Sequence, residues 1–136
     1  MTTTLDAPRI SGNVLTAIEE LKRDVAPAEL VIEADGQGGA RVRFGPVTLS
    51  EIWEQRETWM AGHITVQIPY ADIYPVFVRG DLARADGKGL VAPLSSGHIF
   101  MGQPAVQVSR KSNRRDAAIE TPKIKFLKVL HWINTQ

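Results

Sequence analysis

Residues 64–82, "ITVQIPYADIYPVFVRGDL", decide the fold class because they read as two strands separated by a turn. In residues 63–69, "HITVQIP", apolar and polar side chains alternate with the period of a half-buried strand, which Pro69 ends. The run "PVFVRG", residues 75–80, predicts a further strand. Tyr74 lies in the turn that joins them. Successive strands with a short connection favour an antiparallel sheet.

Upstream of this stretch the sequence predicts a helix and a hairpin. Val14, Ile18 and Leu21 recur at helical spacing, so an amphipathic helix is expected that ends before Pro27. The runs "ELVIEA" and "ARVRF" are strand-like, and "DGQGG" between them supplies the glycines that a tight reversal needs. Residues 50–60, "SEIWEQRETWM", fit a helical turn or a loop leading to an edge strand, so they stay unassigned.

Downstream, the sequence predicts a long loop and then a second helix. Residues 80–97 are rich in glycine and in small polar side chains, which is typical of a loop. Thr121 is suited to cap a helix, and Pro122 to its first position, where a missing N–H costs nothing. The apolar stripe of this helix is Phe126, Leu130 and Ile133. Helix, antiparallel strands, loop and helix together indicate the α+β class.

The composition is that of one folded domain. With 136 residues the chain is long enough for one core, so we expect a flexible arm over residues 1–10 and a single domain over residues 11–136. Sixteen basic and fifteen acidic side chains give a nearly neutral total. There is no cysteine, which excludes disulfides, thiolate-bound zinc and a cysteine nucleophile. Neither a membrane span nor a secretory signal is apparent, so a cytoplasmic location is the default expectation.

The strand, Pro69 and the Tyr74-Pro75 pair resemble a segment of the ubiquitin-conjugating (UBC-like) superfamily, in particular its divergent bacterial branches. In that family a histidine opens the active-site loop, the catalytic cysteine follows, and a helix begins beyond it. Here His98 precedes Ser109 by eleven residues, and Thr121 follows Ser109 by twelve. The resemblance therefore aligns Ser109 with the position of the missing cysteine.

The resemblance implies a fold as well as a site. It implies a UBC-like domain with an N-terminal helix, an antiparallel four-stranded meander, an active-site loop and a C-terminal helix, truncated relative to the usual fold. One departure concerns the loop itself. Ile99 and Phe100 follow His98, so the His-Pro-Asn signature of the family is not intact.

The activity that the resemblance implies is transfer of a ubiquitin-like protein from an adenylating enzyme of the ThiF-like type to a target amine. Three interpretations of Ser109 remain open. It could carry the acyl group as an oxyester, it could replace a native cysteine by engineering, or the domain could be a non-catalytic scaffold for a ubiquitin-like protein or its activating enzyme. If Ser109 is a nucleophile, His98 is the candidate base, and Asp116 a candidate to orient it or to activate the incoming amine.

Candidate partner-binding residues lie in two places. The first helix docks the activating enzyme in the resembled family, which singles out Lys22 and Arg23. Arg110 and Lys111 follow the candidate nucleophile and could hold an acidic patch on a partner. Both pairs are equally compatible with ordinary solvated surfaces.

Other site classes find little support in the sequence. The near-neutral total argues against nucleic-acid binding. The three histidines are too scattered to predict a metal site, and no nucleotide or cofactor fingerprint is present. A third hypothesis, an unrelated α+β ligand-binding domain, predicts an enclosed apolar pocket and no Tyr-Pro turn beside Ser109.

Overall fold

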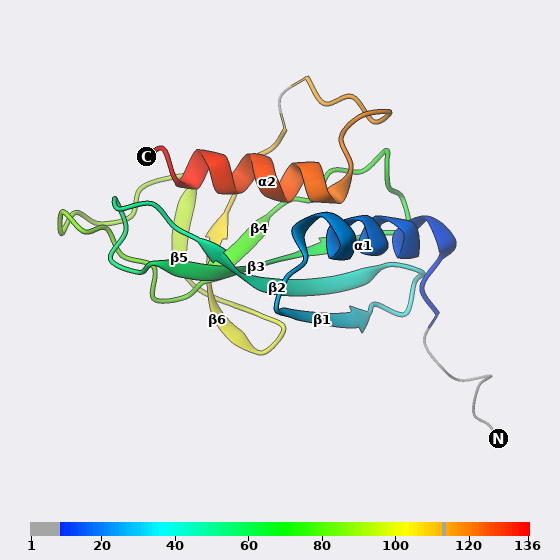
Figure 1. The fold of residues 1–136 in the computed structure, drawn as a ribbon, viewed down its shortest axis with the longest axis horizontal. Coiled ribbons are helices and arrows are strands. Elements are labelled where there is room, and N and C mark those ends of the chain that lie inside the picture. The colour runs from blue at the N-terminus through cyan, green and yellow to red at the C-terminus, as the bar shows by residue number, and fades with distance from the viewer. Residues whose placement is uncertain (1–8, 113) are drawn as a thin grey trace.

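The chain forms one antiparallel sheet covered on one face by two helices (Figure 1). The computed structural model describes residues 9–112 and 114–136, so most of the predicted arm lies outside the described residues. The elements in chain order are α1 (Gly12–Val25), β1 (Glu29–Ala34), β2 (Ala40–Thr48), β3 (Glu57–Ile64), β4 (Val76–Arg79), β5 (Leu94–Phe100), β6 (Gln103–Val108) and α2 (Pro122–Ile133). This arrangement confirms the α+β class with a helix at each end.

The predicted four-stranded meander is only part of the sheet, which has six strands in the order β1-β2-β3-β4-β6-β5. The loop expected from His98 onward is instead a hairpin of β5 and β6, and the loop expected over residues 80–97 ends where β5 begins. Met101 and Gly102 form the two-residue turn with φ of 50° and 76°. Paired positive φ values are typical of hairpin turns, but a methionine there is uncommon. The sequence therefore gave little sign of this hairpin.

The predicted strand over residues 63–69 is wrong beyond Ile64, the last residue of β3. Ile64 pairs with Ala40, where β2 begins, so β3 has no neighbouring strand further along. The following backbone finds other partners. Carbonyl oxygens of Val66 and Ile68 accept hydrogen bonds from the Asn13 side chain at 2.9 and 3.0 Å. These carbonyl groups therefore have hydrogen-bond partners without a neighbouring strand, and the segment forms turns.

The predictions based on local periodicity are confirmed at both ends of the chain. Val14, Ile18 and Leu21 of α1 are buried, and the helix ends at Val25 before Pro27. The β1–β2 hairpin turns at residues 35–39. In α2 the Thr121 hydroxyl accepts a hydrogen bond from the Ile124 N–H at 3.4 Å. The predicted stripe of α2 is buried at Phe126 and Ile133 and half-buried at Leu130. The buried face of the helix also includes Lys125 and Val129, which were not predicted.

Phe126 is the point at which α2 is seated on the sheet. Its ring is fully buried and meets Phe44 of β2 edge-on, with ring centroids 5.0 Å apart. Gly62 of β3 leaves the necessary space, since a Cβ there would lie 2.7 Å from Ile73 Cγ2 and 3.1 Å from the Phe126 ring. The absence of a side chain at position 62 thus sets how closely the helix approaches the sheet.

Gly62→Ala should lower the free energy of unfolding by about 1–3 kcal/mol because the new methyl group overpacks a closed core. Urea denaturation followed by circular dichroism measures this change. Gly89→Ala is the matched control, since nothing lies within 4 Å of the added Cβ. The control should change stability by no more than about 0.5 kcal/mol, or raise it slightly. Equal effects of the two substitutions would contradict the packing described for Phe126.

The face of the sheet opposite the helices carries a smaller apolar cluster. Phe77 of β4 stacks on Phe100 of β5 with ring centroids 4.3 Å apart, beside Ala61 and Ala105. The tip of the β5–β6 hairpin leans back over this face, where the Met101 carbonyl accepts a hydrogen bond from Arg43 Nη1 at 3.3 Å. This hydrogen bond ties the tip of the β5–β6 hairpin to β2.

Candidate functional site

Ser109 lies immediately after β6, at the end of the β5–β6 hairpin. Its N–H donates to the Pro93 carbonyl at 2.9 Å. Its half-buried hydroxyl accepts a hydrogen bond from Gln107 Nε2 at 2.9 Å. A serine needs an adjacent base to become a nucleophile, and an amide cannot remove its proton. The contacts of Ser109 therefore anchor the end of a strand.

His98 is engaged elsewhere on β5. Its Nε2 lies 3.0 Å from the hydroxyl of Ser95. In the register of the hairpin His98 is opposite Ala105, and Ser109 comes four residues later along β6. At the rise of a strand, that places the two positions roughly 13 Å apart. In this conformation His98 is not within reach of the Ser109 hydroxyl.

Asp116 is exposed and organises a turn ahead of α2. Its Oδ1 accepts a hydrogen bond from the Ala118 N–H at 2.9 Å, and its carbonyl oxygen accepts from the N–H groups of Ile119 and Glu120. Its side chain makes no hydrogen bond with His98 or Ser109 within the described part of the chain. The three residues predicted to be catalytic thus occupy three separate places.

The Tyr-Pro turn does lie beside the loop that follows Ser109. Lys111 Nζ is 5.4 Å from the centroid of the Tyr74 ring. Asp72, in the same turn, accepts a hydrogen bond from the Ser112 N–H at 3.0 Å. Of the other two motif residues, Pro75 directly precedes β4, and Pro69 lines a small cleft against α1. Asp72 and Tyr74 thus tie the Tyr-Pro turn to the loop that follows Ser109.

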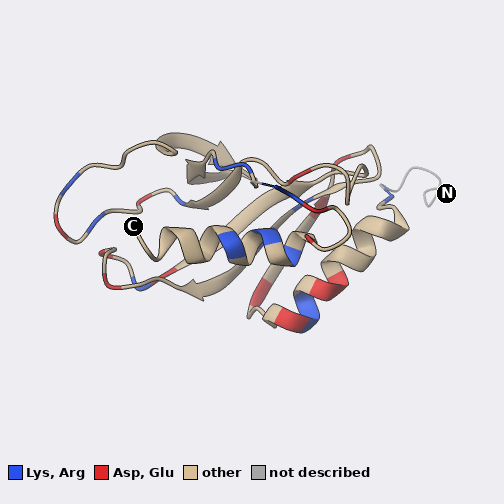
Figure 2. Cartoon of the chain, turned by 90° about the horizontal axis from the view of Figure 1, so that it is seen from above, with Lys and Arg blue, Asp and Glu red and all other residues tan. Residues whose placement is uncertain are grey.

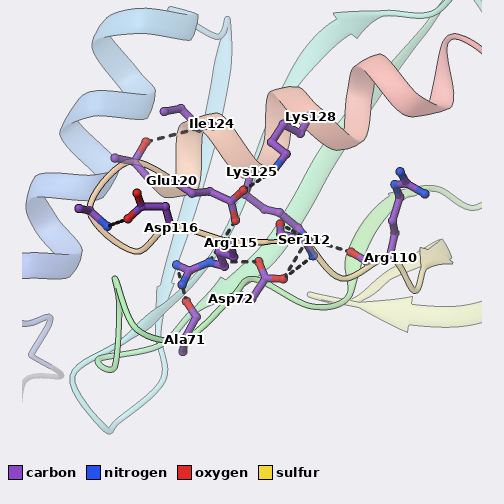
Figure 3. A network of polar contacts seen from close by, with 12 residues as sticks. Ala71, Asp72, Arg110, Ser112, Arg115, Asp116, Glu120, Ile124, Lys125 and Lys128 are labelled. Atoms are coloured by element: carbon purple, nitrogen blue, oxygen red, sulfur yellow. Dashed lines mark hydrogen bonds and ion pairs between the residues drawn. The ribbon is translucent and has the colours of Figure 1, made fainter.

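A buried lysine holds the turn, the loop and α2 together (Figure 3). Lys125 is only 2% exposed, and its Nζ donates to the Arg110 carbonyl at 2.8 Å, to Asp72 Oδ2 at 3.1 Å and to Ser112 Oγ at 3.1 Å. Burial lowers the pKa of Lys125, and the Asp72 carboxylate counteracts this. Because the carbonyl and the carboxylate can only accept, Nζ donates to both, as an ammonium does.

A second set of ion pairs extends this network toward the start of α2. Arg115 Nε lies 3.1 Å from Glu120 Oε2, and Arg115 Nη2 donates to the Ala71 carbonyl at 3.1 Å. Glu120 also pairs with Lys128. Burial works to raise the pKa of the Glu120 carboxyl, but the Lys128 ammonium and the Ser112 hydroxyl together outweigh it, so the pKa lies below its usual range. The loop between Ser109 and α2 is therefore fixed at several points.

Sequence reasoning missed this network, which we call the Lys125 clamp and define as Asp72, Ser112, Arg115, Glu120 and Lys125. One signal was present. Pro122, Lys125 and Val129 fall at helical spacing on one face of α2, so a lysine interrupts an otherwise apolar row. Its partners come from segments far away in the sequence and could not be identified from spacing alone.

The four candidate partner-binding residues form two separate patches. Lys22 and Arg23 lie in the last turn of α1, where Arg23 pairs with Asp24. Asp24 also pairs with Lys123 in the first turn of α2, at 3.2 Å. Arg110 instead stacks over Trp132 at the far end of α2, 5.0 Å from the ring centroid. Nine residues of helix separate positions 123 and 132, or roughly 14 Å.

A cleft runs along the outer side of α2 beside Arg110 and Lys111. Its volume is about 540 Å³. Apolar side chains of Ile124, Leu127 and Trp132 line it together with the basic side chains. We call this the α2 cleft. A concave surface of this kind is typical of binding sites.

A polar pair at the other end of the molecule closes the β1–β2 hairpin. His63 Nε2 lies 2.6 Å from Asp35 Oδ2, while Asp35 Oδ1 accepts hydrogen bonds from the N–H groups of Gln37 and Gly39. The His63 hydrogen bond holds the pKa of the Asp35 carboxyl below its usual range, although burial opposes this. Neighbouring N–H groups act in the same direction as His63. The His63–Asp35 pair therefore stabilises the turn between β1 and β2.

Because the pKa of Asp35 is lowered by folding, its stabilising contribution is present above the unfolded pKa, near 4, and is lost as the pH falls through the folded value. In Asp35→Asn the free energy of unfolding should therefore fall less steeply than in the parent as the pH is lowered through this acidic range. At neutral pH it should cost about 1–3 kcal/mol, as expected for a hydrogen bond to a charged group. Urea denaturation at a series of pH values measures both. Glu51→Gln, at an exposed position, is the control; an acid dependence in Asp35→Asn as steep as in the parent would contradict this role.

In residues 9–112 and 114–136, no group of three or more His, Asp or Glu side chains is placed to hold a metal ion. Over the same residues, neither helix is both long and apolar enough to cross a lipid bilayer.

Comparisons with known proteins add no assignment. No protein-family model, no curated protein and no solved structure matches this chain.

Proposed function

We propose that this chain is a binding domain of the UBC-like type, which holds a ubiquitin-like protein or its adenylating enzyme without carrying the acyl group itself. The observation that carries the proposal is the packing of the Tyr-Pro turn against the loop after Ser109, through Tyr74, Asp72 and Lys125. The order of β1 to β4 after an N-terminal helix is in keeping with it. The alternative hypothesis of an unrelated ligand-binding domain did not predict a Tyr-Pro turn beside the loop that follows Ser109.

The geometry gives less support to an acyl carrier at Ser109. An oxyester forms when the serine oxygen attacks an activated carboxyl carbon while a base accepts its proton. The hydroxyl of Ser109 is instead hydrogen-bonded to the Gln107 amide, and the His98 ring is within hydrogen-bond distance of the Ser95 hydroxyl. The loop is also fixed by the Lys125 clamp, which suits a preformed binding surface. Holding a partner requires such a surface and no nucleophile.

The experiment is a binding titration by calorimetry with the ubiquitin-like proteins and ThiF-like adenylating enzymes of the source genome. We expect at least one of them to bind the parent protein, and Ser109→Ala to bind it with an affinity within about twofold, since the hydroxyl makes no contact with the partner. Failure of every such protein to bind would overturn the proposal. Loss of binding in Ser109→Ala, with an unchanged circular dichroism spectrum, would also overturn it.

A further inference from the structure

Positive charge is concentrated in one segment of a nearly neutral chain. Residues 110–131 contain seven Lys and Arg side chains and two acidic ones, whereas the rest of the chain contains nine basic and thirteen acidic residues. In the structure this segment comprises the loop after Ser109 and most of α2 (Figure 2). This segment is therefore strongly basic, and the rest of the chain carries an excess of acidic residues.

The α2 cleft lies within this basic region and combines charge with an apolar floor. Arg110, Lys111, Lys125, Lys128 and His131 line it, and none of the described residues that line it is acidic. Leu127, whose side chain also lines the cleft, is 41% exposed although it is a large apolar residue. A cleft with this lining offers burial to an apolar group and cations to the groups around it.

The cations of the cleft differ in how far their charge is already neutralised. Lys125 is occupied by the clamp, and Lys128 pairs with Glu120. Arg110 and Lys111 are exposed and stack on Trp132 and Tyr74, and within the described part of the chain neither forms an ion pair with a carboxylate. Stacking on rings holds both cations in place without neutralising them. They are preorganised for anionic groups that come from outside the domain.

We infer that the α2 cleft binds an acidic segment of a partner protein, with one apolar side chain of that segment packed against Leu127 and its carboxylates facing Arg110, Lys111 and His131. The inference deepens the proposed function, on which it rests for the identity of the partner. The charge complementarity and the apolar floor supply the chemistry.

A nucleic acid is the less favoured anion for this cleft. Single-stranded nucleic acids bind through aromatic platforms on which bases stack, and Trp132, the aromatic residue of the cleft, is already covered by Arg110. The remaining floor is aliphatic. Outside the basic segment the chain carries a net negative charge, which would repel a long phosphate backbone.

The test measures binding of a short synthetic peptide rich in Asp and Glu with one central Phe, by fluorescence anisotropy. We expect binding that weakens as salt is raised, because exposed charges are screened. Replacing the Phe by Ser should weaken binding roughly tenfold, which corresponds to the burial of one apolar side chain. Arg110→Glu with Lys111→Glu should weaken it at least about tenfold.

Arg9→Glu with Arg56→Glu is the matched control because it makes the same change in net charge at two exposed positions that do not line the cleft. The control should bind the peptide with an affinity within about twofold of the parent. Leu127→Ser tests the apolar contact and should remove the difference between the Phe and Ser peptides. Circular dichroism and thermal denaturation establish that each variant is folded.

Four results would overturn the inference. The first is no detectable binding of the acidic peptide, the second equal binding of the Phe and Ser peptides, and the third equal weakening by the control with Arg9→Glu and Arg56→Glu. The fourth is tighter binding of a single-stranded oligonucleotide than of the peptide at the same ionic strength. If the peptide does not bind while a ubiquitin-like protein or adenylating enzyme does, the inference falls and the proposed function stands. If the peptide binds while none of those proteins does, the proposed function falls and the acidic-segment site stands.

Discussion

Lys125→Met should lower the free energy of unfolding by about 3–5 kcal/mol, and the melting temperature by roughly 10–20 °C. The lysine Nζ is buried and has three oxygen partners, one of which is the Asp72 carboxylate. Methionine fills a similar volume but makes none of these hydrogen bonds. It leaves Asp72 with Arg115, whose Nε lies 3.8 Å from Oδ1, as its remaining cation, and that Oδ1 has no hydrogen-bond partner. The penalty combines the weakened pairing of Asp72 with the loss of the donor to the Arg110 carbonyl and to the Ser112 hydroxyl.

The controls for this prediction use a neighbouring lysine and the partner acid. Lys123→Met removes an ion pair with Asp24 on the more exposed side of α2 and should cost less than about 1 kcal/mol. Combining Lys125→Met with Asp72→Asn should cost less than the sum of the two single substitutions, because the amide no longer buries a charge. Chemical denaturation of the four variants measures the coupling. A loss of less than about 1 kcal/mol in Lys125→Met would mean that the clamp does not fix the loop.

Trp53→Ala should also cost about 3–5 kcal/mol. The indole is 1% exposed in the segment between β2 and β3, and its Nε1 donates to the Ile133 carbonyl at the end of α2, at 3.0 Å. Truncation therefore opens a large cavity and also leaves a helix-terminal carbonyl without its partner. Both losses act on the contact between α2 and the sheet.

Two variants separate these contributions. Trp53→Phe retains much of the packing but removes the donor to Ile133, so it should cost about 1–3 kcal/mol. Tyr70→Ala removes an aromatic ring that is 84% exposed and should change stability by less than about 0.5 kcal/mol. Thermal and urea denaturation measure the stability of Trp53→Ala, Trp53→Phe and Tyr70→Ala. If Trp53→Ala were no worse than Tyr70→Ala, the segment between β2 and β3 would not contribute to the core.

The elements that sequence predicted well are those specified by their own residues. The stripe of Val14, Ile18 and Leu21 and the signals Thr121 and Pro122 depend on neighbours within a few positions, and both helices are confirmed. Alternation in residues 63–69 predicted a strand, but strands need partners. Since β2 begins at Ala40, the pairing ends at Ile64 whatever side chains follow.

The candidate site was less accessible to sequence reasoning for a related reason. The resemblance implied that Ser109 and His98 share one loop, whereas the β5–β6 hairpin puts His98 within the ladder and Ser109 just beyond its end. The Lys125 clamp joins residues 72, 112 and 125, which no local pattern connects. The Tyr-Pro turn was recognisable because its residues are consecutive, and its place beside the loop depends on contacts that only the folded chain displays.

The central claim is that the loop after Ser109 binds a partner but does not carry an acyl group. Its most direct test mixes the domain with a ubiquitin-like protein, its ThiF-like adenylating enzyme and ATP, and detects products by denaturing electrophoresis and intact mass. We predict a complex under native conditions and no covalent adduct of this chain that hydroxylamine cleaves. A hydroxylamine-sensitive adduct in the parent protein that Ser109→Ala abolishes would contradict the claim.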